Sequence, residues 1–124
     1  MPSNLAHHQS FVATTDFSTS GSGQYRFVKL DTAGGLVLAG NGQSPIGVLQ
    51  DAPSSGQPGS VAGPGSRTPI QCGGSFSIGD RISCDANGKA ILSVSGDFIL
   101  GRAITAGASS TLADILFQPE PSKM

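Results

Sequence analysis

The sequence contains few of the residue types that usually carry chemistry. Of its 124 residues none is Trp, one is Tyr, two are Cys and two are His. Without aromatic platforms, a carbohydrate site or a site for single-stranded nucleic acid is disfavoured. Only 12% of the residues are charged, the net charge is −1, and the seven Lys and Arg are scattered along the chain. We therefore expect no nucleic-acid partner, since binding to phosphates needs concentrated positive charge.

Long hydrophobic runs are also missing. The longest apolar stretches are about five residues, far short of a membrane span. The first residues lack the charged and apolar regions of a secretory signal. We expect no membrane association, and we expect synthesis in a reducing cytoplasm, where two cysteines stay unpaired.

No catalytic, metal-binding or cofactor-binding pattern is present. The two histidines, His7 and His8, lie near the N-terminus in a segment without strand or helix signals, where a catalytic base could not be held rigidly. Cys72 and Cys84 have no neighbouring Cys or His to complete a zinc site, so two small buried hydrophobic residues are the favoured interpretation, with a disulfide as the alternative. Most of the eight acids stand beside Gly, Ala, Asn or Ser, a pattern typical of turns. The sequence predicts no enzyme.

Glycine is abundant, with 18 residues, and it separates short apolar runs. Turns recur every eight to twelve residues, and the Asp85–Gly88 segment carries the Asn-Gly hairpin signal. This pattern predicts an all-β domain, a small sandwich or barrel of about seven to nine short strands. The expected strands include residues 25–30, 36–38, 46–49, 68–72, 81–84, 90–92, 98–101 and 112–117.

The predicted domain spans residues 24–118, between an extended N-terminal arm with its linker (1–23) and a C-terminal tail (119–124). A Pro/Gly/Ser-rich loop is expected at 51–66, around a brief apolar stretch at 60–62. The arm carries large apolar side chains that a disordered segment would not need, which favours docking on a neighbouring subunit. The predicted partner-binding residues are Phe11, Val12, Phe17 and Tyr25.

A weak internal repeat relates residues 30–49 to residues 83–103. Each segment runs from a turn glycine (Gly35 or Gly88) through a short apolar strand to an Ile-Gly or Leu-Gly pair ending at Gly47 or Gly101. Two copies are too few for a solenoid, so the repeat predicts a pseudo-symmetric pair of sheets.

The order of the short motifs resembles that of tailed-phage head decoration proteins of the capsid-cement type. The motifs that carry the resemblance are Phe27–Leu30, Ile46–Val48, Ile70–Gly74, Ile78–Ile82, Asp85–Ala90, Phe98–Ala103 and Ile115–Phe117. The resemblance implies a non-enzymatic β-rich protein without cofactors, made in the cytoplasm of a host bacterium. It would be displayed on the outer surface of the virion capsid as a homo-oligomer, with a trimer favoured. There it would clamp neighbouring subunits of the major capsid protein.

Two other functions share parts of this pattern. A phage tail, baseplate or fibre domain, or a host-surface adhesin, would show the same succession of strands and turns. A small cysteine-dependent hydrolase would use Cys72 or Cys84 as its nucleophile. Copy number in purified particles distinguishes the first alternative from a head protein, and alkylation of both thiols tests the second.

Overall fold

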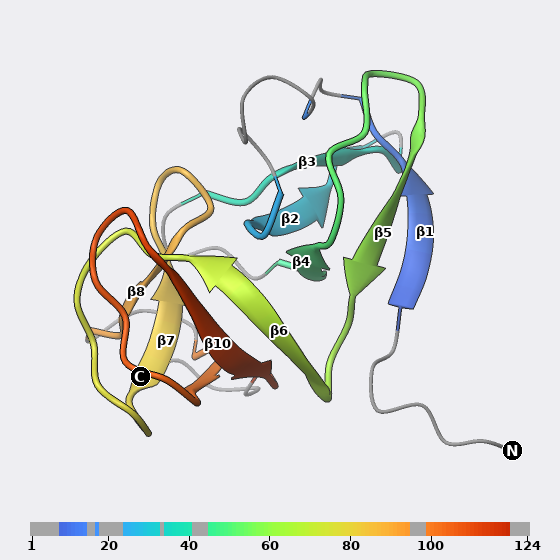
Figure 1. Cartoon of the computed structure of the whole chain (residues 1–124). Coiled ribbons are helices and arrows are strands. Elements are labelled where there is room, and N and C mark those ends of the chain that lie inside the picture. The colour runs from blue at the N-terminus through green and yellow to red at the C-terminus, as the bar shows by residue number, and fades with distance from the viewer. Residues whose placement is uncertain are drawn as a thin grey trace, which may run out of the picture.

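Short strands joined by tight turns make up the chain (Figure 1). The computed structural model describes residues 8–14, 17, 24–32, 34–40, 45–94 and 99–119, and over these residues it has ten β-strands and no helix. In chain order they are β1 (His8–Val12), β2 (Phe27–Leu30), β3 (Leu36–Leu38), β4 (Gly47–Leu49), β5 (Pro58–Ala62), β6 (Ser66–Gln71), β7 (Arg81–Cys84), β8 (Ala90–Leu92), β9 (Gly101–Ala103) and β10 (Leu112–Phe117).

The strands form two five-stranded sheets in which all neighbours are antiparallel. Sheet A has the order β1-β5-β4-β2-β3 and sheet B has the order β6-β10-β9-β7-β8. Each sheet is drawn from one half of the chain, and the two halves form two lobes joined between β5 and β6 (Figure 1). The predicted all-β, sandwich-like fold is confirmed.

The two sheets repeat one topology, which confirms the predicted pseudo-symmetric pair. Raising each strand number of sheet A by five gives the order of sheet B. The register repeats as well, because a constant offset of 54 residues relates the Val28–Gly47 pair to the Ile82–Gly101 pair. We refer to residues 8–62 as repeat 1 and to residues 66–117 as repeat 2.

The first strand of each repeat follows a different offset, of 59 residues. The parallel bridge from Ala13 to Leu36 corresponds to the bridge from Cys72 to Ala90. Phe17 donates its backbone N–H to the Pro53 carbonyl, as Phe76 does to that of Gly107. Repeat 1 therefore has five more residues than repeat 2 between this Phe and the next strand.

Equivalent turns connect the second and third strands of each repeat. Asp31 Oδ1 accepts the N–H of Gly35 at 2.9 Å, and Asp85 Oδ1 accepts the N–H of Lys89 at 2.9 Å. The residue before each donor is a glycine with positive φ, 85° at Gly34 and 77° at Gly88. The repeat read from the sequence pairs Gly35 with Gly88, whereas in the structure the counterpart of Gly88 is Gly34.

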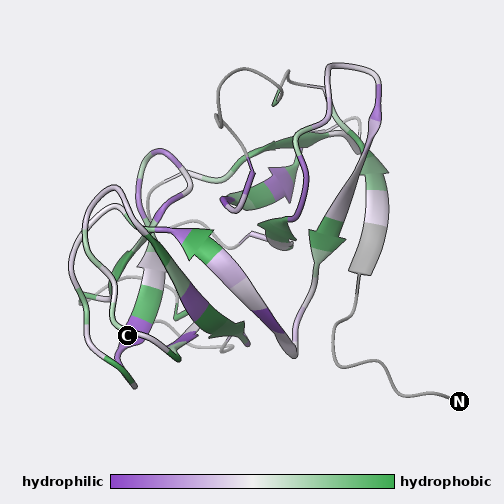
Figure 2. Cartoon of the chain, in the orientation of Figure 1, coloured by the Kyte–Doolittle hydropathy of each residue, from purple (hydrophilic) through white to green (hydrophobic). Residues whose placement is uncertain are grey.

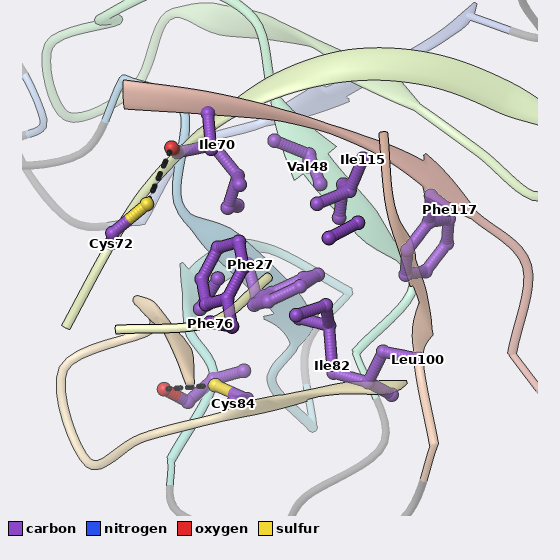
Figure 3. Close-up of a cluster of buried hydrophobic side chains, with 14 residues drawn as sticks. Phe27, Val48, Ile70, Cys72, Phe76, Ile82, Cys84, Leu100, Ile115 and Phe117 are labelled. Carbon is purple, nitrogen blue, oxygen red and sulfur yellow. Dashed lines mark hydrogen bonds between the residues drawn. The ribbon is translucent and has the colours of Figure 1, made fainter. Parts of the chain in front are cut away.

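Two hydrophobic clusters fill the interior. The smaller one belongs to repeat 1 and contains Ala13, Phe17, Val28, Leu36, Leu49 and Val61. The larger one contains the equivalent residues of repeat 2, together with Phe27, Ala39 and Val48 from repeat 1. Because successive side chains of a strand point to opposite faces, Phe27 lies on the face of sheet A opposite to Val28. We refer to the Phe27 side as the outer face of sheet A, and to the side of Ile82, the counterpart of Val28, as the inner face of sheet B. The outer face of sheet A packs onto the inner face of sheet B (Figure 3).

Part of the predicted N-terminal arm lies within the domain. β1 pairs with β5 along its whole length, and Ala13 and Phe17 are buried in the cluster of repeat 1. The predicted 51–66 loop likewise contains β5 and the start of β6. β1 and β5 are therefore additional strands, and with them the number of strands is ten, above the predicted seven to nine. Residues 1–7, 15–16, 18–23 and 120–124 of the predicted arm and tail lie outside the described residues.

Candidate functional site

Polar contacts fasten the two repeats at one end of their interface. Phe27 donates its N–H to the Gly88 carbonyl at 2.7 Å, and Gln71 donates its N–H to the Tyr25 carbonyl at 2.7 Å. The Gln71 side-chain amide also donates to the Gln24 carbonyl at 2.6 Å. The start of β2 is thereby held between the end of β6 and the β7–β8 turn.

Gly88 is required at this junction for two reasons. Its φ of 77° lies in the left-handed region that favours glycine, and a Cβ at this position would lie 2.9 Å from the Phe27 carbonyl oxygen. Arg26 adds bonds from Nε to Gln71 Oε1 at 3.3 Å and from Nη1 to the Asn87 carbonyl at 3.4 Å. The Asn-Gly turn predicted as a hairpin therefore also serves as a contact between the repeats.

Beside this junction lies an open cleft of about 440 Å³, which is the candidate site. Repeat 1 contributes two neighbouring residues and repeat 2 contributes the others. The lining residues are Gln24, Tyr25, Gln71, Lys89, Ser110, Thr111 and Leu112. The cleft combines an aromatic ring, an ammonium group, hydroxyls and amides with an apolar side chain, which suits contact with a mixed polar and apolar partner surface.

Two of the lining residues have a backbone conformation that is unfavourable for their type. Tyr25 has φ of 61° and Ser110 has φ of 67°, and they are the non-glycine residues with positive φ among the described residues. Their counterparts in the other repeat are both glycines, Gly79 and Gly56, with φ of 86° and 87°. The hydrogen bonds confirm the match, because the N–H groups of Tyr25 and Gly79 donate to the last residues of β4 and β9. In each equivalent pair the residue beside the cleft is therefore the one that is not glycine, and backbone strain of this kind often clusters at functional sites.

The predicted partner-binding residues do not come together. Tyr25 lies in the cleft, whereas Val12 is 52% exposed on the edge strand β1. Phe11, half-buried, lines a pocket of about 50 Å³ with Ile46 and Val61. Phe17 is 1% exposed and packs within its own chain, so in this structure its ring is not presented to a neighbour.

Sequence reasoning did not single out Lys89, Ser110 or Leu112. A signal for Ser110 was present, since the 54-residue offset aligns it with a glycine of the first repeat. The signal can be used only when the turns of the two repeats are aligned correctly. The repeat read from the sequence is shifted by one residue at the first turn, because it pairs Gly35 with Gly88.

The cysteines are poorly suited to nucleophilic chemistry. Both are free and buried, as predicted. Burial, with a smaller contribution from the Asp85 carboxylate, raises the pKa of Cys84 to about 12. Burial also raises the pKa of Cys72. Each Sγ lies near a main-chain carbonyl, that of Ala39 for Cys84 at 3.7 Å and that of Ile70 for Cys72 at 3.8 Å (Figure 3).

The part of the chain that the structure describes has no group of three or more His, Cys, Asp or Glu placed to hold a metal ion. Within the same residues, no helix is long and apolar enough to cross a membrane.

The fold defines a class of protein built from two tandem copies of a five-stranded antiparallel unit, the outer face of one copy packing on the inner face of the other. One solved structure of this class is the crystal structure of the N-terminal base of the head fibre protein gp8.5 of bacteriophage phi29. It is similar to 97% of this chain over 98% of its own length, with a TM-score of 0.74 and 15% sequence identity. No family model matches the sequence, and no curated protein matches it.

Proposed function

We propose that this protein is a non-enzymatic structural subunit of a phage head, attached to the outer surface of the capsid shell. The observation that carries the proposal is the end-to-end likeness to the head fibre base of phi29, a protein of a phage head. Likeness over 97% of one chain and 98% of the other means that the whole two-repeat unit is shared, rather than one sheet.

The physical character of the molecule supports a role in binding other proteins. Its two repeats are fixed to each other by a shared core and by junction hydrogen bonds, which favours a rigid body over a hinged one. Several large apolar side chains remain exposed and are available to contact a partner protein. These residues are Val12, Leu30, Ile78, Leu92, Val94 and Leu112.

The resemblance to capsid-cement proteins supports a more specific form of the proposal. In this form a homotrimer of the chain bridges neighbouring subunits of the major capsid protein and strengthens the boundary between them. Interfaces of ordinary size, repeated over a lattice, would add large total stability through multivalency.

A fibre base is a second candidate, because the similar solved structure is itself the base of a head fibre. In that role the chain would bind the shell and carry a projecting element, without strengthening the shell. The predicted tail, baseplate and adhesin alternatives stay predictions.

Heads lacking this protein, assembled from the major capsid protein of the same genome, provide the test. Purified chain should sediment with these heads, and cryo-electron microscopy should show it on their outer surface. A decoration protein should also raise the temperature at which the heads open, whereas a fibre base should leave that temperature unchanged. Heads that recruit no protein at saturating concentration would contradict both candidates.

A further inference from the structure

The cleft between the repeats contains a lysine without a partner. Lys89 is half-buried and follows the β7–β8 turn, which is hydrophilic in Figure 2. Its ammonium group forms no ion pair and no hydrogen bond with any residue that the structure describes. The neighbouring Asp85 uses Oδ1 to accept the N–H groups of Asn87 and Lys89 within the turn, at 2.8 and 2.9 Å. The cleft therefore carries a positive charge that no described carboxylate pairs with.

Packing does not explain why this residue is a lysine. Gly73 leaves space for its side chain, because a Cβ added to Gly73 would lie 3.2 Å from Lys89 Cβ. In repeat 1 the arrangement is reversed, since Gly35 is the counterpart of Lys89 and Thr14 is the counterpart of Gly73. Thr14 Cγ2 would lie 2.1 Å from a Cβ added to Gly35. A small side chain is thus enough to fill this place, so the charge of Lys89 is available for binding.

Two hydroxyl groups in the cleft are also unused. The side chains of Tyr25 and Ser110 form no hydrogen bond over the described ranges of the chain, and both hydroxyls can donate one. Both residues carry a side chain despite a positive φ, whereas their counterparts are glycines. None of the lining residues is acidic, and Leu112, 56% exposed, adds an apolar contact. The cleft thus combines unpaired donors with an apolar side chain, which makes it complementary to a carboxylate.

We propose that the cleft receives an acidic side chain from a protruding segment of a partner protein, bound through Lys89, Tyr25 and Ser110. The residue next to the acid on that segment contacts Leu112. The identity of the partner rests on the proposed function, under which the segment belongs to the major capsid protein at the outer surface of the shell.

The shape and lining of the cleft favour a protein segment over other sources of negative charge. Sites for small molecules enclose most of the ligand and are lined mainly by apolar side chains, whereas this cleft is open and mainly polar. Nucleic acid is disfavoured, because a single ammonium group in a chain of net charge −1 provides little attraction for phosphates.

The first experiment measures binding to heads lacking the protein for wild type, Lys89→Gln and Lys89→Arg. Lys29→Gln, on β2, is the control, because it removes the same charge outside the cleft. Lys89→Gln should weaken binding by about tenfold or more, since a charged hydrogen bond is lost, and the control by less than about twofold. Lys89→Arg keeps the charge and should bind within about threefold of wild type. Lys89→Met replaces Lys89→Gln if that variant fails to fold.

The second experiment identifies the group that Lys89 meets. A carbodiimide reagent joins an amine directly to a carboxylate only when the two are in contact. Treatment of decorated heads, followed by proteolysis and mass spectrometry, should recover Lys89 linked to an Asp or Glu of the major capsid protein. The same link should be absent from heads decorated with Lys89→Gln.

Each outcome decides the inference. A Lys89→Gln variant that binds heads like wild type would overturn the role of the cleft while leaving the head role intact. Loss of binding in Lys89→Gln without a cross-linked carboxylate of the capsid protein would overturn the acidic protein partner. A wild type that binds no heads would overturn the proposed function and this inference together.

Discussion

The ring of Phe27, from sheet A, lies 6.0 Å from the ring of Phe117, from sheet B, with the two planes tilted by 43°. Both side chains are fully buried, so this pair belongs to the shared core of the two repeats. Phe27→Ala should lower the free energy of unfolding by about 3–5 kcal/mol, through lost burial and the cavity left behind. Urea denaturation followed by far-UV circular dichroism measures this, with Leu92→Ala, 45% exposed, as the control.

The same variant tests whether the repeats unfold together. Because the larger cluster combines residues of both sheets, we expect a single transition in wild type. Two separated transitions in wild type, or a Phe27→Ala loss below about 1 kcal/mol, would contradict the shared core.

Gly47 and Gly101 are the glycines of the Ile-Gly and Leu-Gly pairs in the sequence repeat. The structure explains why each of these positions is a glycine. A Cβ on Gly101 would lie 2.1 Å from the Leu116 carbonyl oxygen, and one on Gly47 would lie 2.3 Å from that of Ala62. Gly101→Ala and Gly47→Ala should each destabilise the fold by roughly 1–3 kcal/mol, because the neighbouring strand must shift.

Gly74→Ala is the matched control for this prediction, since its added Cβ would make an ordinary contact at 3.7 Å. Thermal unfolding of the three variants in one buffer gives the comparison. Equal melting temperatures would mean that the strands are not held this closely.

Ser110 and its counterpart Gly56 allow a reciprocal test of backbone strain at the cleft. Ser110→Gly removes the strain of positive φ, worth about 1–2 kcal/mol, against a gain in unfolded-state entropy of about 0.4–1 kcal/mol. We expect a net stabilisation of about 0.5 kcal/mol. Gly56→Ser should destabilise by a similar net amount, about 0.5 kcal/mol, because the same two terms act with opposite sign and an added Cβ meets no atom within 4 Å.

If the strained residues serve the cleft, Ser110→Gly should stabilise the chain and also weaken head binding. A variant that is more stable and binds heads normally would show that the strain has no part in attachment. Denaturant titration and sedimentation with heads give the two readouts.

The thiol of Cys84 should make stability depend on alkaline pH. Its pKa is raised from 9.0 to about 12 in the folded chain, mainly by burial. Below pH 9 the thiol is neutral in both states and its contribution is fully present. Between pH 9 and about 12 the thiol of the unfolded chain ionises while that of the folded chain does not, so stability falls as pH rises.

Melting temperature measured from pH 8 to pH 10.5 should therefore decline less in Cys84→Ala than in wild type. Native protein should also react slowly with iodoacetamide at pH 8 and quickly in urea. Rapid alkylation of Cys84 in the native chain would contradict its burial.

The strands that could be predicted from the sequence are those whose apolar pattern and flanking turns lie within a few neighbouring residues. β7 and β8 flank an Asn-Gly turn, so their pairing could be read from a few residues. β1 was not predicted, because its partner β5 lies about fifty residues away and its own residues show no clean period. The sequence predicts a loop in place of β5 because β5 begins with Pro58 and Gly59, residues that are depleted in strand interiors but tolerated at strand ends.

The candidate site could be predicted only in part. Tyr25 was singled out for its type, and it lies in the cleft. Outside the cleft, Arg67, Arg81 and Arg102 lie in one row across sheet B, which could not be predicted because these residues are scattered in sequence and meet only through the register of four strands. Cross-strand registers depend on the whole sheet, which composition and spacing do not specify.

β5 ends at Ala62 and β6 begins at Ser66, so three residues join the two sheets. The contact between the repeats therefore resembles a subunit interface, except that both partners belong to one chain and are tethered to each other. Its formation is independent of protein concentration, because a short tether holds the second unit at a high effective concentration. Dilution that dissociates an oligomer of this protein should therefore leave every two-repeat unit whole.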